Sequence, residues 1–188
     1  MKTLALFDFD GTLYKKDSLL EFTKYSRGDL NFYFGMMLLL PYLLFLKLGI
    51  MSNEKVKIKF IKHFYGFCNY KHFQAIAKDF AVNEIESNLN QKIYENFQNH
   101  IKLKHEIYIV TASFPEWIEP WCSKYGIQVI GTELKILDGK ISGNFTTKNC
   151  FGLEKVNRIK AVINLNHFDR IEVYGSGKGD LEMLKLRK

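Results

Sequence analysis

Residues 7–13 read Phe-Asp-Phe-Asp-Gly-Thr-Leu and directly follow a short apolar run, Leu-Ala-Leu. The run predicts a buried strand over residues 3–8, and Gly11 allows the backbone to turn away sharply after it. Asp8 and Asp10 lie two positions apart at this turn, so both carboxylates can converge on one phosphoryl group or one hard cation. One carboxylate can then attack phosphorus while the other transfers protons. A strand-end turn with two solvated aspartates fits the same spacing.

The composition describes a globular chain with an excess of positive charge. Its 188 residues suit one domain, or one domain with an insertion, and a hydrophobic content of 47% is enough for a substantial core. Lysine and arginine number 27 against 20 acidic residues, which gives a net charge of +7 and favours anionic partners such as phosphate esters, anionic lipids or nucleic acid. The lysines are spread along the chain without an arginine-rich tract or a nucleic-acid motif, so we expect no nucleic-acid partner.

The cysteines and the N-terminal region favour a cytoplasmic protein. Cys68, Cys122 and Cys150 are far apart and form neither a metal-type pair nor a disulfide framework, as is typical of a reducing compartment. The first apolar run is too short for a signal peptide and leads straight into Asp8. We therefore expect a cytoplasmic location.

The segment 32–50 carries one charge, Lys47, in nineteen residues. Its length is at the lower limit for crossing a bilayer, and four lysines between positions 55 and 62 follow it, as in a basic flank beside a membrane. We favour a helix, or two helices broken near Pro41, that is buried in a small bundle or lines a pocket. Membrane-surface contact through residues 32–62, peripheral to the inner face of the membrane, and a true span stay open. A span conflicts with flanks that belong to one folded unit.

The periodicity of apolar residues changes along the chain. After the first strand, residues 17–99 read as almost entirely helical, with Asp17 as the first N-cap. From residue 106 the pattern becomes α/β, with strands over 107–110, 127–130 and 171–174, helices over 117–125 and 156–163, and a hairpin over 135–141 with an Asp-Gly turn. This order predicts a parallel, Rossmann-like α/β core with helices on both faces, formed by residues 1–14 and 100–188. An all-helical cap over residues 15–99 interrupts this core after its first strand.

Chemically useful side chains follow the predicted strands at their carboxyl ends, where the catalytic groups of such cores gather. The first strand ends in Asp8 and Asp10, the second in Thr-Ala-Ser at 111–113, and the last in the acidic, glycine-rich loop 175–180. Lys155 opens the helix between them. Two acids, a hydroxyl, a lysine and such a loop are the groups used in Mg²⁺-assisted phosphoryl transfer. Taken alone, the threonine also fits a strand-end hydrogen bond and the lysine an ordinary surface position.

Four stretches of the chain resemble, in this order, the four motifs of the haloacid dehalogenase-like phosphatase superfamily: DFDGTL at 8–13, VTAS at 110–113, GLEK at 152–155 and YGSGKGD at 174–180. The position of the helical insertion resembles that of the phosphoserine-phosphatase-like branch, whose small helical cap follows the first motif. The resemblance spans nearly the whole chain. The first motif is specific, and the other three gain weight from their order.

The resemblance implies a role for each matching residue. Asp8 would attack phosphorus and become an aspartyl-phosphate, and Asp10 would protonate the leaving group and then activate water. Thr111 would hydrogen-bond a phosphate oxygen, and Lys155 would neutralise charge on the nucleophile and the phosphoryl group. The phosphate-binding groups implied in this way are Gly11, Thr12, Thr111, Ala112, Ser113 and Lys155. The Mg²⁺ cofactor would lie between Asp8, the carbonyl group of Asp10, and the loop with Ser176 and Asp180.

Ser176 is the main departure from the pattern of the family. Phosphoserine phosphatases usually carry at this position an aspartate that ligates the metal, whereas serine is a neutral and poorer Mg²⁺ ligand. Asp180 keeps the second acidic position and could bind the metal directly or through water. The chain also ends at Lys188, soon after this loop, where relatives usually continue with another strand. We expect either a truncated chain or a core without that edge.

The residues of the cap bear on the substrate. Asp17 lies where phosphoserine phosphatases use an acid to hold the amino group of the substrate, but it is equally suited to an N-cap, which we favour. The insertion is unusually apolar for a module that selects a small polar amino acid, and some relatives with a similar apolar stretch act on phosphatidylglycerophosphate. We therefore expect an Mg²⁺-dependent phosphomonoester hydrolase that acts on a small phosphate ester or an amphiphilic lipid phosphate. Because of Ser176, the alternative is a weakly active or inactive phosphate-binding module that acts through its apolar cap.

Overall fold

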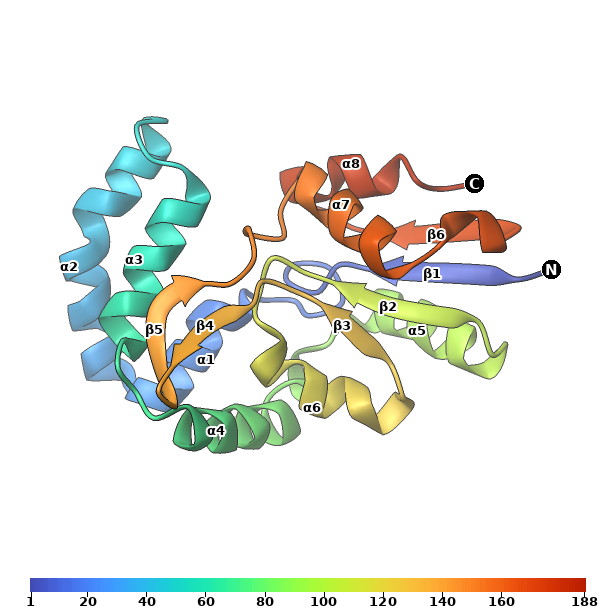
Figure 1. Ribbon diagram of the computed structural model, residues 1–188. Helices are drawn as coiled ribbons and strands as arrows, with labels where there is room; N and C mark the ends of the chain where they lie inside the picture. The colour runs from blue at the N-terminus through green and yellow to red at the C-terminus, as the bar shows by residue number, and fades with distance from the viewer.

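Four parallel strands form the central sheet of the computed structural model, which describes residues 1–188 (Figure 1). In spatial order they are β3 (Gln128–Ile130), β2 (Glu106–Val110), β1 (Thr3–Phe7) and β6 (Arg170–Tyr174). Leu6 of β1 lies opposite Tyr108 of β2 on one side and Val173 of β6 on the other. All residues of β1 are buried, because a central strand of a parallel sheet is covered on both faces. The four predicted strands are confirmed.

Helices cover both faces of this sheet, as Figure 1 shows. They are α5 (Gln91–Lys102), α6 (Glu119–Cys122), α7 (Leu153–Val162) and α8 (Leu181–Leu184). Leu6 shares a buried apolar cluster with Met183 of α8. Phe7 points to the opposite face, where its ring centroid lies 5.5 Å from that of Phe97 in α5. Side chains that alternate along β1 therefore enter two separate cores, and the predicted α/β architecture is confirmed.

Four helices form the cap beyond the carboxyl ends of the strands: α1 (Ser18–Arg27), α2 (Asp29–Lys47), α3 (Asn53–Tyr65) and α4 (Tyr70–Asn83). The carboxylate of Asp17 accepts a hydrogen bond from the backbone N–H of Leu20 at 3.1 Å, at the start of α1. This is the N-cap geometry that satisfies a free amide of the first turn. The predicted N-cap role of Asp17 is confirmed.

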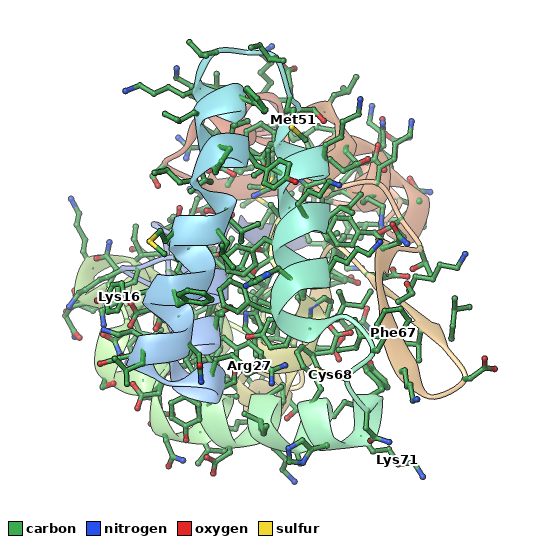
Figure 2. All side chains as sticks on the ribbon, turned by 90° about the vertical axis from the view of Figure 1, so that its left-hand side faces the viewer. Lys16, Arg27, Met51, Phe67, Cys68 and Lys71 are labelled. Atoms are coloured by element: carbon green, nitrogen blue, oxygen red, sulfur yellow. The ribbon has the colours of Figure 1, made fainter.

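The apolar segment after Gly28 forms one continuous helix, α2, that runs through Pro41. Figure 2 shows α2 and α3 side by side on the outside of the cap. One stripe of α2 is buried, through Phe32, Gly35 and Leu39, whereas its opposite face is open to solvent. The prediction of a buried or pocket-lining helix is therefore right for the inner face of α2 and wrong for its outer face. By length and composition, α2 is also the one helix of the structure that could span a membrane.

The cap does not end at residue 99, as the sequence analysis predicts. Helix α5 begins at Gln91 and packs on the sheet, so the return to the core comes about ten residues earlier. The hairpin of β4 (Leu134–Leu137) and β5 (Lys140–Phe145) lies instead beside α3, where Phe67 N–H donates to the carbonyl of Ile141 at 2.7 Å. The cap therefore contains a hairpin in addition to the predicted helices. The apolar periodicity predicts each element but not the surface against which it packs.

Candidate active site

Three chain segments meet at the ammonium group of Lys155, in the first turn of α7. Its Nζ donates hydrogen bonds to Asp8 Oδ1 at 2.6 Å, to Asp180 Oδ1 at 2.6 Å and to the carbonyl oxygen of Val110 at 2.8 Å. All three charged side chains are buried, with at most 6% of each residue exposed. The carboxyl ends of β1, β2 and β6 therefore place the predicted nucleophile, lysine and acidic loop within direct contact.

The charges in this cluster do not balance. Burial raises the pKa of Asp8, while the Lys155 ammonium opposes that shift. Burial alone would lower the pKa of Lys155, but the carboxylates of Asp8 and Asp180 outweigh it and the net shift is upward. Lys155 therefore stays protonated, and when Asp8 and Asp180 are both ionised its single charge offsets only one of the two carboxylates. Such a site attracts a further cation.

Asp10 is held beside Asp8 by the start of the cap. Its Oδ1 accepts a hydrogen bond from the backbone N–H of Ser18 at 2.7 Å. Burial raises the pKa of Asp10 to about 7, and the nearby carboxylate of Asp17 adds to that shift. A carboxyl group with such a pKa exists in both protonation states near neutral pH, as a general acid and base requires.

The loop after β6 is joined to the loop after β1 by Ser176. The Ser176 hydroxyl donates to the carbonyl oxygen of Gly11 at 3.0 Å and lies 3.0 Å from the hydroxyl of Thr12. The Thr12 hydroxyl in turn donates to Asp8 Oδ2 at 2.8 Å. The backbone N–H groups of Ser176 and Gly177 donate to Asp180 Oδ2 at 3.0 and 2.8 Å. Ser176 therefore connects the two acidic loops and helps to orient Asp180.

The oxygen atoms around this cluster are the type of donor that Mg²⁺ prefers. In the structure they come from the carboxylates of Asp8 and Asp180 and the hydroxyl of Ser176, which is linked to Asp8 through Thr12. No group of three or more His, Cys, Asp or Glu side chains is placed to hold a metal ion. The donors and the unbalanced negative charge fit Mg²⁺, provided that carbonyl oxygen and water complete its coordination, as is usual for this ion.

The residues after β2 form the remaining part of the predicted phosphate site. Thr111 is fully buried, and its Oγ1 accepts a hydrogen bond from Ser113 N–H at 2.9 Å. The Ser113 hydroxyl lies 2.9 Å from the hydroxyl of Ser18 in α1. Together with Ala112, these residues line the same pocket as Asp8 and Lys155. Of the predicted phosphate-binding residues, only Gly11 and Thr12 do not line it.

Lys57, on helix α3 of the cap, is a candidate site residue that the sequence analysis missed. Its Nζ donates to the carbonyl oxygen of Ala112 and, at 3.3 Å, to Asn149 Oδ1, and it lies 4.6 Å from the ring centroid of Phe114. Burial lowers the pKa of Lys57 to about 8. One turn earlier, Glu54 Oε2 accepts from Asn149 N–H at 2.8 Å. These contacts tie α3 to the loop that carries Thr111.

The pocket that contains these groups has a volume of about 540 Å³ and two unlike ends. Its polar end is formed by the acids, Lys155 and the residues after β2. The cap contributes mainly apolar side chains from α1, α2 and α3, together with the polar Asp17, Asn53 and Lys57; the apolar ones are Leu19, Leu20, Met36, Leu43, Leu46, Val56 and Phe60. The pocket therefore suits a molecule with an anionic group at one end and an apolar part at the other.

Comparison with known proteins agrees with this arrangement. Residues 5–185 match the family of haloacid dehalogenase-like hydrolases. The protein CicA of Caulobacter vibrioides is 30% identical over 185 residues, a match that covers 97% of this chain and 82% of CicA.

Two solved structures share the fold. A Bordetella pertussis Tohama I protein of unknown function superposes with a TM-score of 0.81 at 19% identity, over all of this chain and 87% of that one. A phosphoserine phosphohydrolase-like protein from Francisella tularensis gives a TM-score of 0.64 at 20% identity, over 98% of this chain and 82% of that one. These superpositions show that the chain shares the fold of both proteins.

Proposed function

The chain belongs to the haloacid dehalogenase-like hydrolase family, and we propose that it is an Mg²⁺-dependent phosphatase that cleaves phosphomonoesters through an aspartyl-phosphate on Asp8. The single observation that carries this proposal is the contact of Lys155 with both Asp8 and Asp180 at the polar end of the pocket. A buried carboxylate beside a fixed cation is an oriented nucleophile for an anionic phosphoryl group.

The first step forms a bond between a carboxylate oxygen of Asp8 and phosphorus, while the bond from phosphorus to the ester oxygen breaks. Asp10, which its raised pKa keeps partly protonated near neutral pH, gives its proton to the leaving oxygen. In the second step Asp10 takes a proton from water as that water attacks phosphorus. The bond between phosphorus and the Asp8 oxygen breaks, inorganic phosphate leaves, and Asp8 is again a carboxylate while Asp10 is again protonated.

Residues around Asp8 would hold the phosphoryl group and the metal. Lys155 would offset the negative charge of the phosphoryl oxygens, and the Thr111 hydroxyl and the backbone N–H of Ala112 would donate to them, whereas the Ser113 N–H already donates to Thr111 Oγ1. Mg²⁺ would be held by Asp8, the carbonyl group of Asp10, and Asp180 or Ser176 of the glycine-rich loop. When bound, the ion supplies positive charge that stabilises the phosphoryl oxygens.

The pocket supports an amphiphilic substrate over a small polar one. The Asp17 carboxylate lines the pocket, but its Oδ1 accepts the Leu20 N–H, so one of its two oxygens caps the helix and is not free for the amino group of an amino acid. Most of the cap side chains that line the pocket are apolar. We therefore propose a lipid phosphate monoester as the substrate, with its apolar part against α1, α2 and α3.

The three cysteines are free, in agreement with the proposed cytoplasmic location.

Hydrolysis of a panel of phosphomonoesters tests this function. The panel contains a soluble aryl phosphate, phosphoserine and a short-chain lipid phosphate, each with Mg²⁺ and with a chelator, for the wild type and for Asp8→Asn. We expect Mg²⁺-dependent turnover that the variant loses, with the lipid phosphate preferred over phosphoserine. Binding of phosphate without turnover of any ester by the wild type would instead identify a binding module, with Ser176 as the reason.

A further inference from the structure

Helix α2 presents apolar side chains to solvent along its whole length. Its outer face consists of Tyr33, Phe34, Met37, Leu38, Leu40, Leu44 and Phe45, which are 41–61% exposed. No charged residue occurs from position 30 to 46. A helix on a protein surface normally turns a polar face to water, and a helix that is apolar on all sides is covered by something. Only 17% of the apolar window of α2 is buried within the fold, so the rest of the chain leaves most of this helix uncovered.

The inner face of α2 fixes how this helix can meet a partner. A Cβ atom at Gly35 would lie 2.6 Å from Cε1 of Phe64 in α3, so the two helices touch at this glycine. The ring of Phe32 stacks at 6.3 Å from that of Phe64. Because α2 is packed in this way on a folded cap, it cannot cross a bilayer alone. The helix is about 28 Å long. It can lie parallel to the membrane surface, with its outer face toward the lipid chains.

Lysines surround the outer face of α2. Lys24 Nζ lies 5.6 Å from the ring centroid of Tyr33, Lys59 Nζ lies 5.5 Å from that of Tyr42, and Lys47 occupies the last turn of the helix. Residues 29–65 contain five lysines and two acidic residues. Lys57 is bound to the core, Asp29 lies 3.5 Å from Lys24 Nζ, and Glu54 accepts a hydrogen bond from the core, so lysines remain in excess around this face. An apolar strip bordered by cations is complementary to a bilayer with anionic headgroups.

The inner face of α2 is also part of the candidate active site. Met36, Leu43 and Leu46 line the pocket, less than one turn away from outer-face residues Met37 and Leu44. A bilayer that covers the outer face therefore lies next to the apolar wall of the pocket.

We propose that the outer face of α2, with Lys24, Lys47 and Lys59, docks this protein on the surface of a bilayer that contains anionic lipids. The docked helix lies in the plane of the headgroups and places the apolar end of the pocket beside the lipid chains. A phosphomonoester lipid can then present its headgroup to Asp8 without leaving the membrane entirely. The access of a lipid headgroup to Asp8 rests on the proposed function, whereas the docking itself does not.

A second copy of the chain fits the outer face less well. A symmetric pair would bring the same surfaces together, and with them Lys24, Lys47 and Lys59 of both copies. Like charges at an interface oppose association, whereas an anionic membrane attracts the same lysines.

Flotation with lipid vesicles tests the docking on the full chain. Vesicles of phosphatidylcholine alone are compared with vesicles that hold roughly one third phosphatidylglycerol, at low and high salt. We expect binding to the anionic vesicles that falls as salt rises. The variant Phe34→Gln/Met37→Gln/Leu44→Gln should lose at least tenfold of that binding, and Lys47→Glu/Lys59→Glu should lose the preference for anionic lipid.

The matched control is Leu137→Gln/Val162→Gln, which changes two exposed apolar residues away from α2 and should bind as the wild type does. Hydrolysis of the soluble aryl phosphate should be equal in all variants, which reports correct folding. A wild type that hydrolyses this ester but does not float with vesicles overturns the docking and leaves the proposed function intact. A dimer in light scattering that the α2 variant dissociates also overturns it. Flotation without hydrolysis of any ester supports the docking and refutes the proposed function.

Discussion

Ser176 occupies the position at which a carboxylate would most directly increase the negative charge around the proposed metal. Its hydroxyl instead donates to Gly11 and contacts Thr12. We predict that Ser176→Asp lowers the Mg²⁺ concentration for half-maximal activity by about tenfold, because a carboxylate is the stronger ligand for a hard cation. Titration of activity with Mg²⁺ measures the effect, with Ser176→Ala as the control that removes only the hydroxyl. An unchanged Mg²⁺ requirement in Ser176→Asp would place the metal away from this loop.

Lys57 connects the cap to the loop that carries Thr111. Replacement by methionine keeps the length of the side chain but removes the hydrogen bonds to Ala112 and Asn149. We predict a fall of about tenfold in kcat/KM for a soluble ester, since a displaced phosphate loop weakens binding of the transition state. Lys59→Met is the matched control, because Lys59 is exposed on the same helix and does not contact the core. Equal kinetics for both variants would contradict a positioning role.

These residues also show how far sequence reasoning reaches at this scale. Asp8, Lys155 and Asp180 were predictable as neighbours, because the ends of adjacent parallel strands meet at one edge of the sheet. Lys57 was not predictable in the same way. It belongs to a run of lysines at every second position, and only the packing of α3 determines which of them turns toward the core.

At the scale of elements, the contact of α2 with α3 depends on one glycine. A Cβ at Gly35 would meet both the ring of Phe64 and, at 2.8 Å, Nε2 of His63. We predict that Gly35→Leu lowers the free energy of unfolding by about 1–3 kcal/mol, the usual effect of overpacking a close contact. Urea unfolding measures this loss, and Leu38→Ala on the exposed face of the same helix should change stability much less. A Gly35→Leu variant as stable as the wild type would mean that the two helices separate freely.

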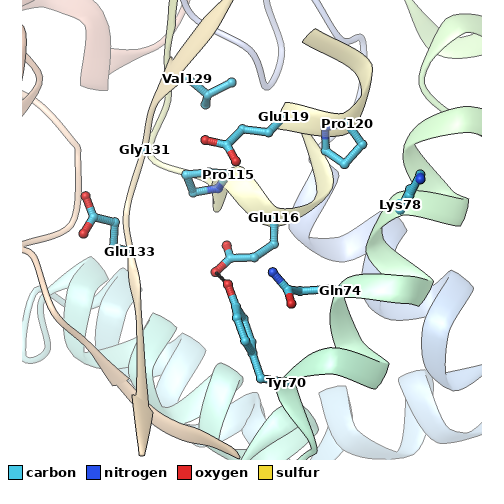
Figure 3. A pocket seen from close by; sticks show the side chains of 10 residues that line it. All are labelled: Tyr70, Gln74, Lys78, Pro115, Glu116, Glu119, Pro120, Val129, Gly131 and Glu133. Carbon is cyan, nitrogen blue, oxygen red and sulfur yellow. Dashed lines mark hydrogen bonds between the residues drawn. The ribbon is translucent and has the colours of Figure 1, made fainter. Parts of the chain in front are cut away.

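A second pocket, of about 430 Å³, lies between α4 and the turn after β2 (Figure 3). Glu116 Oε1 accepts a hydrogen bond from the Tyr70 hydroxyl at 3.2 Å, whereas Oε2 is buried without a partner. Burial is the main cause that raises the pKa of Glu116 to about 7. The folded chain therefore holds this proton more tightly than the unfolded chain does, and folding becomes less favourable as the carboxyl group ionises.

Glu116→Gln should remove this pH dependence. Below the unfolded pKa of about 4.5 the two proteins should have similar stability, since both side chains are neutral. As the pH rises through the range from about 4.5 to 7, the wild type should lose stability on the order of 1–3 kcal/mol relative to the variant. Urea unfolding at both ends of this range measures the difference. A difference that is the same at both pH values would contradict the assignment to Glu116.

The elements themselves were largely predictable, whereas their partners were not. The strands follow from short apolar runs, the cap helices from apolar periodicity, and the β4–β5 hairpin from its Asp-Gly turn at residues 138–139. The packing of the hairpin on α3 and of α5 on the sheet depends on tertiary contacts that leave no local pattern. The exposed face of α2 could not be predicted for the same reason, since an apolar helix has the same sequence pattern whether the fold or an outside partner covers it.

At the scale of the whole molecule, the sheet edge and the cap define one pocket with a charged end and an apolar end. The same helix, α2, lines that pocket with one face and carries the exposed apolar surface on the other. The net charge of +7 is compatible with an anionic substrate and with an anionic surface. The proposed hydrolysis at the sheet edge and the proposed docking of the cap on a membrane would thereby act on the same lipid substrate.

The central claim is that Asp8 carries the phosphoryl group during turnover, and acid quenching tests it most directly. The enzyme is mixed with a radiolabelled phosphomonoester and Mg²⁺, denatured in acid within the first turnover, and its labelled peptide is identified by mass spectrometry. We predict label on the peptide with Asp8 in the wild type and none in Asp8→Asn. With an aryl ester, whose leaving group departs without a proton from Asp10, label should accumulate further in Asp10→Asn because hydrolysis of the intermediate slows. Turnover by the wild type with no covalent label in either the wild type or Asp10→Asn would contradict the account, because phosphate would then pass to water without Asp8 as the nucleophile.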